Sequence, residues 1–339
     1  MNINSIHIIN KYLRKFAFFA SFAFFIFSCT GKQTPYQENT GEIFHTYYSI
    51  KYEFDHSLES EILAELQRFD LSLNPFNPQS IISKVNKNEA VEADSFFVEV
   101  FRKAMEVSEA SGGMFDITVA PFVNLWGFGY ENTNIVNPAV IDSLKEFVGY
   151  RKIRLEGNRI VKTDSRVQLN TSAISKGYAV DVVCQLFERQ GIKNYMCEIG
   201  GELRSKGVNE KGKCWRIGIS KPIDDKTGLN TEIQAILKIC DKAVATSGNY
   251  RNFYIRNGKK YAHTINPLTG YPSEQDILSA TVIANDCMTA DAYATAFMAL
   301  GSKEAQKLKI PNVDYYFILA NDEIVYSTGF ENFFSTHSD

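Results

Sequence analysis

The sequence predicts an α+β protein in which mixed or antiparallel sheets pack against helices. Segments with helical spacing of apolar residues are few, and most strand-like segments follow one another directly in the C-terminal half. Helices and strands segregated in this way favour α+β architecture over a doubly wound sheet, in which they alternate. Hydrophobic residues make up 45% of the 339 residues, enough for one large core or two closely associated subdomains.

The N-terminus is predicted to be an export signal rather than part of the fold. Basic residues precede a nearly uncharged run at 16–28, which ends at Cys29 and is shorter than the ~20 residues of a membrane-spanning helix. Ser28 before the cysteine resembles a bacterial lipoprotein signal, although Phe27 is bulkier than the usual residue there. We expect a signal peptide over 1–28 and a lipid on Cys29. Ordinary signal cleavage and an uncleaved anchor are the alternatives.

A polar stretch follows the signal. Residues 29–41 contain Gly, Lys, Gln, Thr, Pro and Asn with almost no apolar side chains, which predicts a flexible tether. The folded domain is then expected over 42–335. Together these segments predict a lipid-anchored protein on the periplasmic side of the bacterial cell envelope.

Charge and cysteine content exclude several classes of protein. The net charge is −3 with both signs interspersed, so no basic surface for nucleic acid or for a membrane is indicated. Beyond Cys29 the chain has an odd number of cysteines without CxxC spacing, and we interpret them as core residues. A zinc site or a thiol redox site is the alternative. These cysteines are Cys184, Cys197, Cys214, Cys240 and Cys287.

The elements are predicted from the N-terminal side onward. Apolar spacing predicts helices over residues 57–69 and 97–110, and extended runs around Gly157 predict a hairpin that leads into a strand at 167–169. A further helix is expected over 173–190, where Gly191 is a plausible stop signal. The remaining expected elements are strands near 193–199, 214–220, 232–239, 242–247, 251–256, 260–265 and 279–285, a helix over 287–300 and two closing strands.

Two distant stretches have the composition of one metal and phosphate site. Residues 170–179 place small and polar residues and Lys176 at the expected helix start, where backbone N–H groups favour a phosphate. In the second stretch, Asp291 and Thr295 are four residues apart on an expected helix, so they lie on one face. Their hard oxygen atoms are ligands that magnesium prefers. Phosphate and magnesium together indicate phosphoryl chemistry.

Three loops give weaker signals. Paired glycines at 112–113 permit a tight backbone path close to a ligand, although a helix end followed by a strand explains them equally well. His263 precedes an Asn-Pro turn and can bond a phosphate or move a proton, although a single histidine is more often structural. Residues 245–250 offer hydroxyl groups and a glycine turn, and an ordinary connecting loop would have the same composition.

Five ordered motifs together resemble those of the ApbE family of FAD:protein FMN transferases. The resemblance runs from about Glu42 to the final strands and implies a magnesium-dependent, exported enzyme of T-fold-like α+β architecture. Family members split FAD, attach FMN through its phosphate to a threonine or serine of a target flavoprotein, and release AMP. The motifs are residues 112–118, 121–127, 176–181, 263–272 and 290–295.

The resemblance also implies roles for individual residues. The magnesium ligands would be the backbone oxygen of Ala173 and the side chains of Asp291 and Thr295. Asp291 and His263 would be the catalytic candidates, with Asp291 able to help deprotonate the attacking hydroxyl and His263 expected as a polar contact to the phosphates. The residues expected around FAD are Phe76, Met114, Phe115, Asp116, Asn170, Lys176, His263 and Ile265.

Some positions depart from the family pattern. The commoner pattern has an acidic residue at Asn170, so one expected FAD contact is weakened. Phe44 and His45 replace a more usual Met-Gly pair over the flavin, and Phe76 keeps an aromatic face without a hydroxyl. Neither Asp291 nor Thr295 is affected.

Three functions from different classes follow. The first is transfer of FMN from FAD to an exported flavoprotein, such as a subunit of a membrane redox pump. The second is magnesium-dependent hydrolysis of FAD to FMN and AMP, for which the expected residues are identical. The third is a flavin-binding lipoprotein without catalytic activity.

Overall fold

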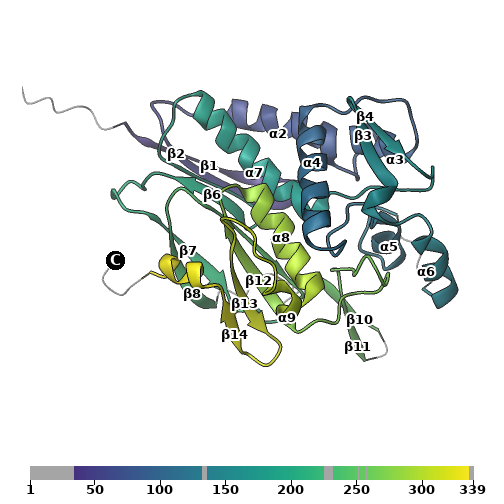
Figure 1. Cartoon of the computed structure of the whole chain (residues 1–339). Coiled ribbons are helices and arrows are strands. Elements are labelled where there is room, and N and C mark those ends of the chain that lie inside the picture. The colour runs from purple at the N-terminus through teal and green to yellow at the C-terminus, as the bar shows by residue number, and fades with distance from the viewer. Residues whose placement is uncertain (1–33, 132–135, 225–231, 251, 257, 336–339) are drawn as a thin grey trace, which may run out of the picture. The chain divides into compact units, whose positions relative to one another are not determined.

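The computed structural model describes residues 34–131, 136–224, 232–250, 252–256 and 258–335 (Figure 1). The chain from Tyr36 onward forms one unit, to which the following description applies. The predicted signal peptide 1–28, Cys29 and the start of the predicted tether lie outside the described residues. None of the helices in the described part of the chain is both long and apolar enough to span a membrane.

The centre of the fold is an eight-stranded sheet in the order β1-β2-β5-β6-β9-β12-β13-β14. All of its neighbouring strands are antiparallel. The predicted α+β class is therefore confirmed. The strands are β1 (Tyr36–Ile43), β2 (Thr46–Glu53), β5 (Tyr195–Ile199), β6 (Glu202–Lys206), β9 (Ala243–Gly248), β12 (Ile277–Ala284), β13 (Asp314–Leu319) and β14 (Ile324–Tyr326).

Three two-stranded antiparallel sheets accompany the central sheet. One of them is the predicted hairpin around Gly157, whose positive φ of 59° suits the turn. The pairs are β3 (Ile153–Glu156) with β4 (Arg159–Lys162), β7 (Trp215–Ser220) with β8 (Ile233–Ile239), and β10 (Phe253–Arg256) with β11 (Lys259–Ala262).

Four long helices share the large hydrophobic core with one face of the central sheet (Figure 1). All four correspond to predicted helices, and they are α2 (Glu59–Leu73), α4 (Ser95–Ala110), α7 (Ser172–Arg189) and α8 (Cys287–Leu300). Shorter helical segments were not predicted. They are α3 (Ile81–Asn86), α5 (Ala120–Leu125), α6 (Pro138–Lys145), α9 (Ser302–Ala305) and the 3-10 turns η1 (Tyr150–Lys152) and η2 (Thr328–Phe333).

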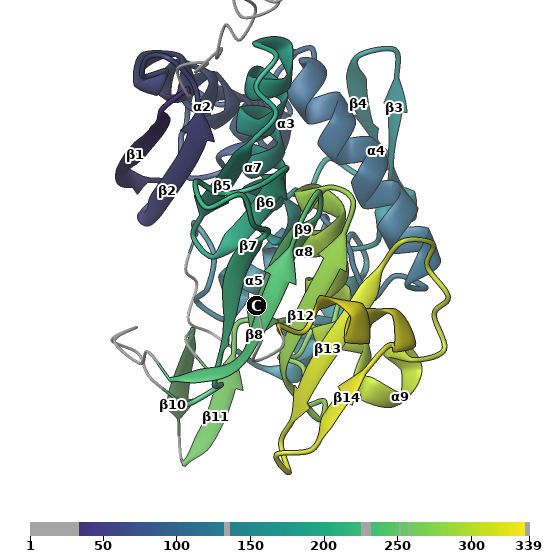
Figure 2. The ribbon, with the colours of Figure 1, turned by 90° about the vertical axis from the view of Figure 1, so that its left-hand side faces the viewer.

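The opposite face of the central sheet is covered by β7, β8 and η2 (Figure 2). Ile219 of β7, Leu237 of β8 and Phe330 of η2 form a second apolar cluster with residues of the central sheet. Because successive side chains of a strand point to opposite faces, the central sheet contributes to both cores. The sheet is thus the middle of three layers.

Helix α7 ends where the sequence predicts. The N–H of Gly191 donates to the carbonyl of Glu188 at 3.1 Å, and the N–H of Ile192 donates to Phe187 at 3.0 Å. Gly191 has a φ of 75°, so this is the glycine-terminated arrangement in which N–H groups beyond the helix donate hydrogen bonds to its last carbonyl groups.

Helices α7 and α8 approach each other most closely at Gly177. A Cβ atom at this position would lie 2.3 Å from the carbonyl oxygen of Cys287 and 2.7 Å from the Cβ of Asp291. Only glycine therefore fits without movement of one of the helices. The contact brings the second turn of α7 against the first half of α8.

A buried carboxylate fixes the same two helices. Asp181 on α7 accepts hydrogen bonds from the N–H groups of Cys287 at 3.0 Å and Met288 at 2.8 Å, at the start of α8. It also pairs with Arg204 of β6 at 3.1 Å. A carboxylate at a helix N-terminus satisfies donors that have no partner within the helix. Asp181 thus ties α7, α8 and β6 together.

The predicted tether is wrong from Tyr36 onward. Residues Tyr36–Gly41 belong to β1, which pairs along its whole length with β2. The strand was missed because it is an edge strand whose residues are mostly polar and only one of which is buried, so it lacks a clear apolar alternation.

The strand predicted at 167–169 is also wrong. These residues have no strand partner, although Val167 and Leu169 are fully buried. Their polar groups are satisfied individually, because the N–H of Leu169 donates to the side chain of Asn86 at 2.7 Å. A short buried apolar run can therefore have the composition of a strand without forming the backbone hydrogen bonds of a sheet.

The interpretation of all five cysteines as core residues is wrong for two of them. Cys214 and Cys240 form a disulfide across the start of β7 and the end of β8, at a sequence separation of 26. Cys184, Cys197 and Cys287 are buried and free, as predicted. Pairing could not be inferred because sequence spacing does not specify connectivity.

The α7–α8 contact gives a stability prediction. Gly177→Ala is expected to lower the free energy of unfolding by about 1–3 kcal/mol, since the added methyl group overlaps with backbone atoms of α8. Thermal unfolding measures this change. Gln185→Ala, at a half-buried position of the same helix, is the control and should leave the melting temperature nearly unchanged. Equal stability of Gly177→Ala and the wild type would contradict the close contact.

Candidate active site

The site lies where the central sheet divides. Strands β6 and β9 pair only through Leu203 with Val244 and Arg204 with Ala243, whereas β9 pairs with β12 along its whole length. The start of β6 and the end of β9 therefore diverge. The opening that results lies beneath α7 and α8.

A cavity of about 840 Å³ occupies this opening. It falls within the size range of pockets that bind small molecules and cofactors. Nearly all the residues predicted from the sequence line it. These are Met114, Phe115, Asp116, Asn170, Ala173, Lys176, His263, Ile265, Asp291 and Thr295.

Phe76 is not brought to this cavity. Its side chain is 55% exposed and meets the ring of Tyr130 edge-on, with 6.1 Å between the ring centroids. It does not belong to the lining. Phe44 is also absent from the lining, because it lies in the turn between β1 and β2 and packs against Phe69. A flavin contact for Phe76 stays a prediction.

The predicted metal ligands meet around one N–H group. In a regular helix the N–H of Gly177 bonds the carbonyl oxygen of Ala173, four residues earlier. Here that N–H also donates to Oδ2 of Asp291 at 2.9 Å. The Ala173 carbonyl and the Asp291 carboxylate therefore lie close to the same donor, although they belong to different helices.

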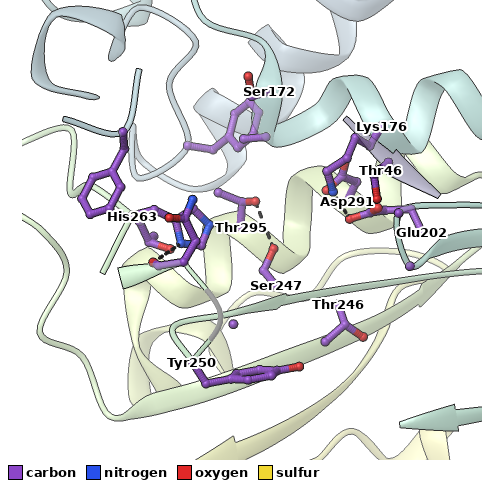
Figure 3. A pocket seen from close by; sticks show the side chains of 18 of the residues that line it. Thr46, Ser172, Lys176, Glu202, Thr246, Ser247, Tyr250, His263, Asp291 and Thr295 are labelled. Atoms are coloured by element: carbon purple, nitrogen blue, oxygen red, sulfur yellow. Dashed lines mark hydrogen bonds and ion pairs between the residues drawn. The ribbon is translucent and has the colours of Figure 1, made fainter. Parts of the chain in front are cut away.

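Thr295 lies one turn after Asp291 on α8 and points toward β9 (Figure 3). Its Oγ1 is 3.2 Å from Oγ of Ser247, which is a hydrogen-bond distance. The predicted spacing of a carboxylate and a hydroxyl on one helix face is thus realised in the cavity wall. Ser247 belongs to the stretch 245–250, whose residues up to Gly248 are the end of β9 and whose last two residues form a turn.

Lys176 does not stand alone in the cavity. Its ammonium group forms an ion pair with Oε1 of Glu202, at the start of β6 (Figure 3). Glu202 is only 4% exposed, and its Oε2 has no hydrogen-bond partner among the described residues. No sequence pattern predicted a role for Glu202 in this site. The preceding Gly200 and Gly201, both at positive φ, were the signal that could have directed attention to it.

Asp291, Glu202 and Lys176 form a charged cluster in which the two carboxylates are buried and the Lys176 side chain is 39% exposed. Burial, opposed by Lys176 and reinforced by the charge of Asp291, raises the pKa of Glu202 to about 7. Burial also raises the pKa of Asp291, which Lys176 and the Gly177 N–H oppose. Burial alone would lower the pKa of Lys176, but the two carboxylates raise it. Excess negative charge in such a place favours a bound cation.

His263 lines the cavity beyond Thr295 (Figure 3). Its Nδ1 is 3.2 Å from the carbonyl oxygen of Asn252, so the neutral ring donates from Nδ1 and keeps Nε2 as an acceptor. Burial lowers its pKa, and Lys176 contributes in the same direction. The ring is therefore neutral at physiological pH. The neighbouring Ile265 is buried and packs with Trp126.

Asp116 shapes the loop that carries Met114 and Phe115. Its Oδ1 accepts from the N–H and the hydroxyl of Thr118, each at 2.7 Å, and its Oδ2 accepts from the N–H of Tyr150 at 2.6 Å. Both oxygens are thus used within the protein. Asp116 holds this wall of the cavity in place.

Asn170 closes the start of α7. Its Oδ1 accepts from the N–H of Ser172 at 2.9 Å, and its own N–H donates to the carbonyl of Ile117 at 2.7 Å. The bond to Ile117 joins the helix start to the loop of Met114 and Phe115. The amide Nδ2 is left as a donor at the cavity wall, where an acidic residue would have offered only acceptors.

In the described ranges, no three His, Cys, Asp or Glu side chains are grouped so that they could hold a metal ion by themselves. The predicted set contains only one such side chain, Asp291, with a hydroxyl and a carbonyl oxygen. That composition suits magnesium, which keeps several waters or phosphate oxygens as ligands.

Comparison with known proteins identifies the family. The sequence model of the ApbE family matches residues 44–317. The chain belongs to the ApbE family. A protein from Vibrio cholerae called FAD:protein FMN transferase is 35% identical over 284 residues, which cover 80% of this chain and 84% of that protein. A protein of the same name from Haemophilus influenzae is 35% identical over 309 residues, covering 86% and 88%.

Solved structures of ApbE proteins have the same fold. The flavin transferase ApbE of Vibrio cholerae matches with a TM-score of 0.79 and 32% identity, covering 88% of this chain and 99% of that chain. The apo form of the Pseudomonas stutzeri flavinyl transferase ApbE matches with a TM-score of 0.78 and 28% identity, covering 89% and 98%. The family resemblance seen in the sequence motifs is thereby confirmed.

The ion pair of Lys176 gives a chemical prediction. Glu202 helps to raise the pKa of Lys176, so Glu202→Gln should lower it and increase the fraction of neutral amine at a given pH. Acetic anhydride reacts with the neutral amine, and quantitative mass spectrometry of the Lys176 peptide should therefore show faster acetylation. The internal reference is Lys145, which pairs with Asp142 on helix α6 and does not line the cavity. An unchanged rate for Lys176 would contradict the ion pair.

Proposed function

We propose that this protein transfers FMN from FAD to the hydroxyl of a threonine or serine in a target flavoprotein, with release of AMP. The single observation that carries the proposal is the convergence of Ala173, Lys176, Asp291 and Thr295 on one cavity. They supply oxygen ligands for a metal ion and a cation for a diphosphate. Membership of the ApbE family and the relatives called FAD:protein FMN transferase support the same reaction.

The residues present fit magnesium. The Asp291 carboxylate, the Thr295 hydroxyl and the Ala173 carbonyl would hold the ion, and the negative charge that Asp291 and Glu202 concentrate beside Lys176 favours it. A bound magnesium ion would neutralise charge that develops on the diphosphate oxygens as the bond breaks. Lys176 would contribute a further positive charge on the same group.

The proposed reaction forms one bond and breaks one. The hydroxyl oxygen of the acceptor attacks the phosphorus on the FMN side of the diphosphate, and the bond from that phosphorus to the oxygen of AMP breaks. The hydroxyl loses its proton, and AMP leaves with the bridging oxygen. Phosphoryl transfer requires little covalent chemistry from the protein, so alignment of the two oxygens is its main task.

Two residues can receive the hydroxyl proton. His263 is neutral and retains Nε2 as an acceptor, because its Nδ1 is engaged with the Asn252 carbonyl. Asp291 is the second candidate, since burial raises its pKa. We assign to His263 a polar contact to the phosphates, and we assign to Asp291 both the positioning of the metal and help in deprotonating the attacking hydroxyl.

We further propose that the protein acts outside the cytoplasm as a lipid-anchored enzyme of the bacterial envelope. The signal-like residues 1–28 and Cys29 motivate this proposal. The disulfide between Cys214 and Cys240 supports it independently, because disulfides persist mainly in oxidising compartments. The acceptor would then be another exported flavoprotein, such as a subunit of a membrane redox pump.

The transfer reaction is tested with FAD, magnesium and a purified candidate acceptor domain. Wild-type protein should add the mass of FMN to the acceptor and release an equal amount of AMP. Asp291→Asn should lower the rate at least about a hundredfold, because the metal ion that would neutralise the diphosphate loses its carboxylate ligand. Intact mass spectrometry and nucleotide chromatography give both readouts.

The controls separate the three functions. Replacement of the acceptor threonine should abolish labelling while leaving FAD binding intact. Release of AMP without labelling of two different acceptors would indicate FAD hydrolysis. Binding of FAD without either product would indicate a flavin-binding protein and refute the proposed catalysis.

Export and anchoring are tested in cells. The full chain should fractionate with membranes and incorporate a labelled fatty acid, and Cys29→Ser should remove the label. Peptide mapping without reduction should recover Cys214 and Cys240 as a linked pair. Unlabelled protein in the cytoplasm with both thiols free would contradict the proposed location.

A further inference from the structure

A part of the cavity lining has no role in the proposed chemistry. The expected FAD and metal residues come from α7, α8 and the loops around Phe115 and His263. The cavity extends beyond them to strands β2, β5 and β7. This extension is called the β7 groove, and it is lined by Tyr47, Met196, Glu198, Arg216, Gly218 and Ser220.

One wall of the β7 groove is the open edge of β7. The strand pairs with β8 on one side, from Trp215 to Ser220. Within the described part of the chain, no backbone hydrogen bond joins these residues to any segment on the other side. An edge of this kind presents alternating N–H and C=O groups to any extended chain beside it.

The floor of the groove is the outer face of the central sheet. Cys197 and Ile199 of β5 point into the helix-side core, so the alternate residues Met196 and Glu198 point to the face on which β7 lies. Tyr47 of β2 is 73% exposed on this part of the cavity wall. Figure 2 shows β7 and β8 in front of the central strands. The groove therefore has an apolar and acidic floor and a backbone wall.

The groove leads directly to the charged cluster. Gly200 and Gly201, which follow β5 in sequence, line the cavity. The next residue, Glu202, also lines it and is the ion-pair partner of Lys176. A Cβ atom at Gly201 would meet nothing within 4 Å, so this stretch leaves room above the backbone. An occupant of the groove can thus extend to the site where the diphosphate is expected.

We infer that the open edge of β7 binds an extended segment of the acceptor polypeptide as an added strand, which places its threonine or serine at the Glu202 end of the groove. The inference rests on the proposed function, because it supplies the acceptor substrate of that reaction. A polypeptide has the regular alternation of donors and acceptors that a strand edge matches, whereas FAD does not. Recognition through the backbone also leaves most acceptor side chains unconstrained.

Charge adds a preference to this backbone recognition. Arg216 is exposed at the edge of β7, and no ion pair of its side chain is recorded in the described residues. An acceptor segment with acidic residues beside its threonine would pair with Arg216. Rim charges of this kind act mainly on the rate of association.

The test uses short fluorescent peptides that span the threonine of the candidate acceptor, each N-methylated at one residue. N-methylation removes one backbone donor, and in an added strand only alternate donors face β7. Affinity for the full-length protein, measured by fluorescence anisotropy, should therefore fall at alternate positions and be retained between them. Losses without this period of two, or equal affinity of all peptides, would overturn the inference.

A protein variant tests the same groove from the other side. For an acceptor peptide with acidic flanks, Arg216→Glu should raise the KM about tenfold while the KM for FAD stays unchanged. Arg256→Glu is the matched control, because Arg256 is exposed on β10 and does not line the cavity. A rise in the KM for FAD instead would assign the groove to the dinucleotide and overturn the inference.

Failure of the two proposals can be distinguished. Peptides that bind with a period of two but never acquire FMN would support the groove and refute the transferase. An intact acceptor that is labelled while no peptide binds would confirm the transferase and overturn strand addition.

Discussion

The close contact of α7 with α8 at Gly177 is the constraint on which the site depends. Without a side chain at this position, the second turn of α7 reaches the backbone of α8, and the N–H group of Gly177 donates to the Asp291 carboxylate. Asp181 holds the start of α8 against the same helix. The proposed oxygen ligands Ala173 and Asp291 are thus positioned by helix packing rather than by a flexible loop, which favours a precise geometry.

The second determinant is the division of the central sheet between β6 and β9. A continuous ladder would fill the space beneath the two helices, but pairing through only two residue pairs opens it. Glu202 and Ser247 then face the cavity from the diverging strands and contact Lys176 and Thr295. One cavity in this way joins a helix-side region suited to a diphosphate with a groove along β7 on the opposite face of the sheet.

Sequence patterns predicted the class of the fold and most of the site, but not its connections. Periodicity predicted α2, α4, α7 and α8, and the four-residue spacing of Asp291 and Thr295 placed both in the cavity wall. The predicted tether includes most of β1, because edge strands have little apolar alternation. The run at 167–169 has the composition of a strand because it is buried, not because it pairs with another strand. Glu202 was missed, and Cys214 with Cys240 was misread, since their partners are distant in sequence and only the fold brings them together.

We propose that Ala173, Asp291 and Thr295 form a magnesium site. The close contact of α7 with α8 at Gly177 determines the geometry of this site. Binding of Mn²⁺, a paramagnetic substitute for magnesium, can be followed by electron paramagnetic resonance with FAD present. We predict binding by the wild type, loss of binding in Asp291→Asn and weaker binding in Gly177→Ala, with Gln185→Ala unchanged. Equal Mn²⁺ affinity in the wild type and Asp291→Asn would contradict the account.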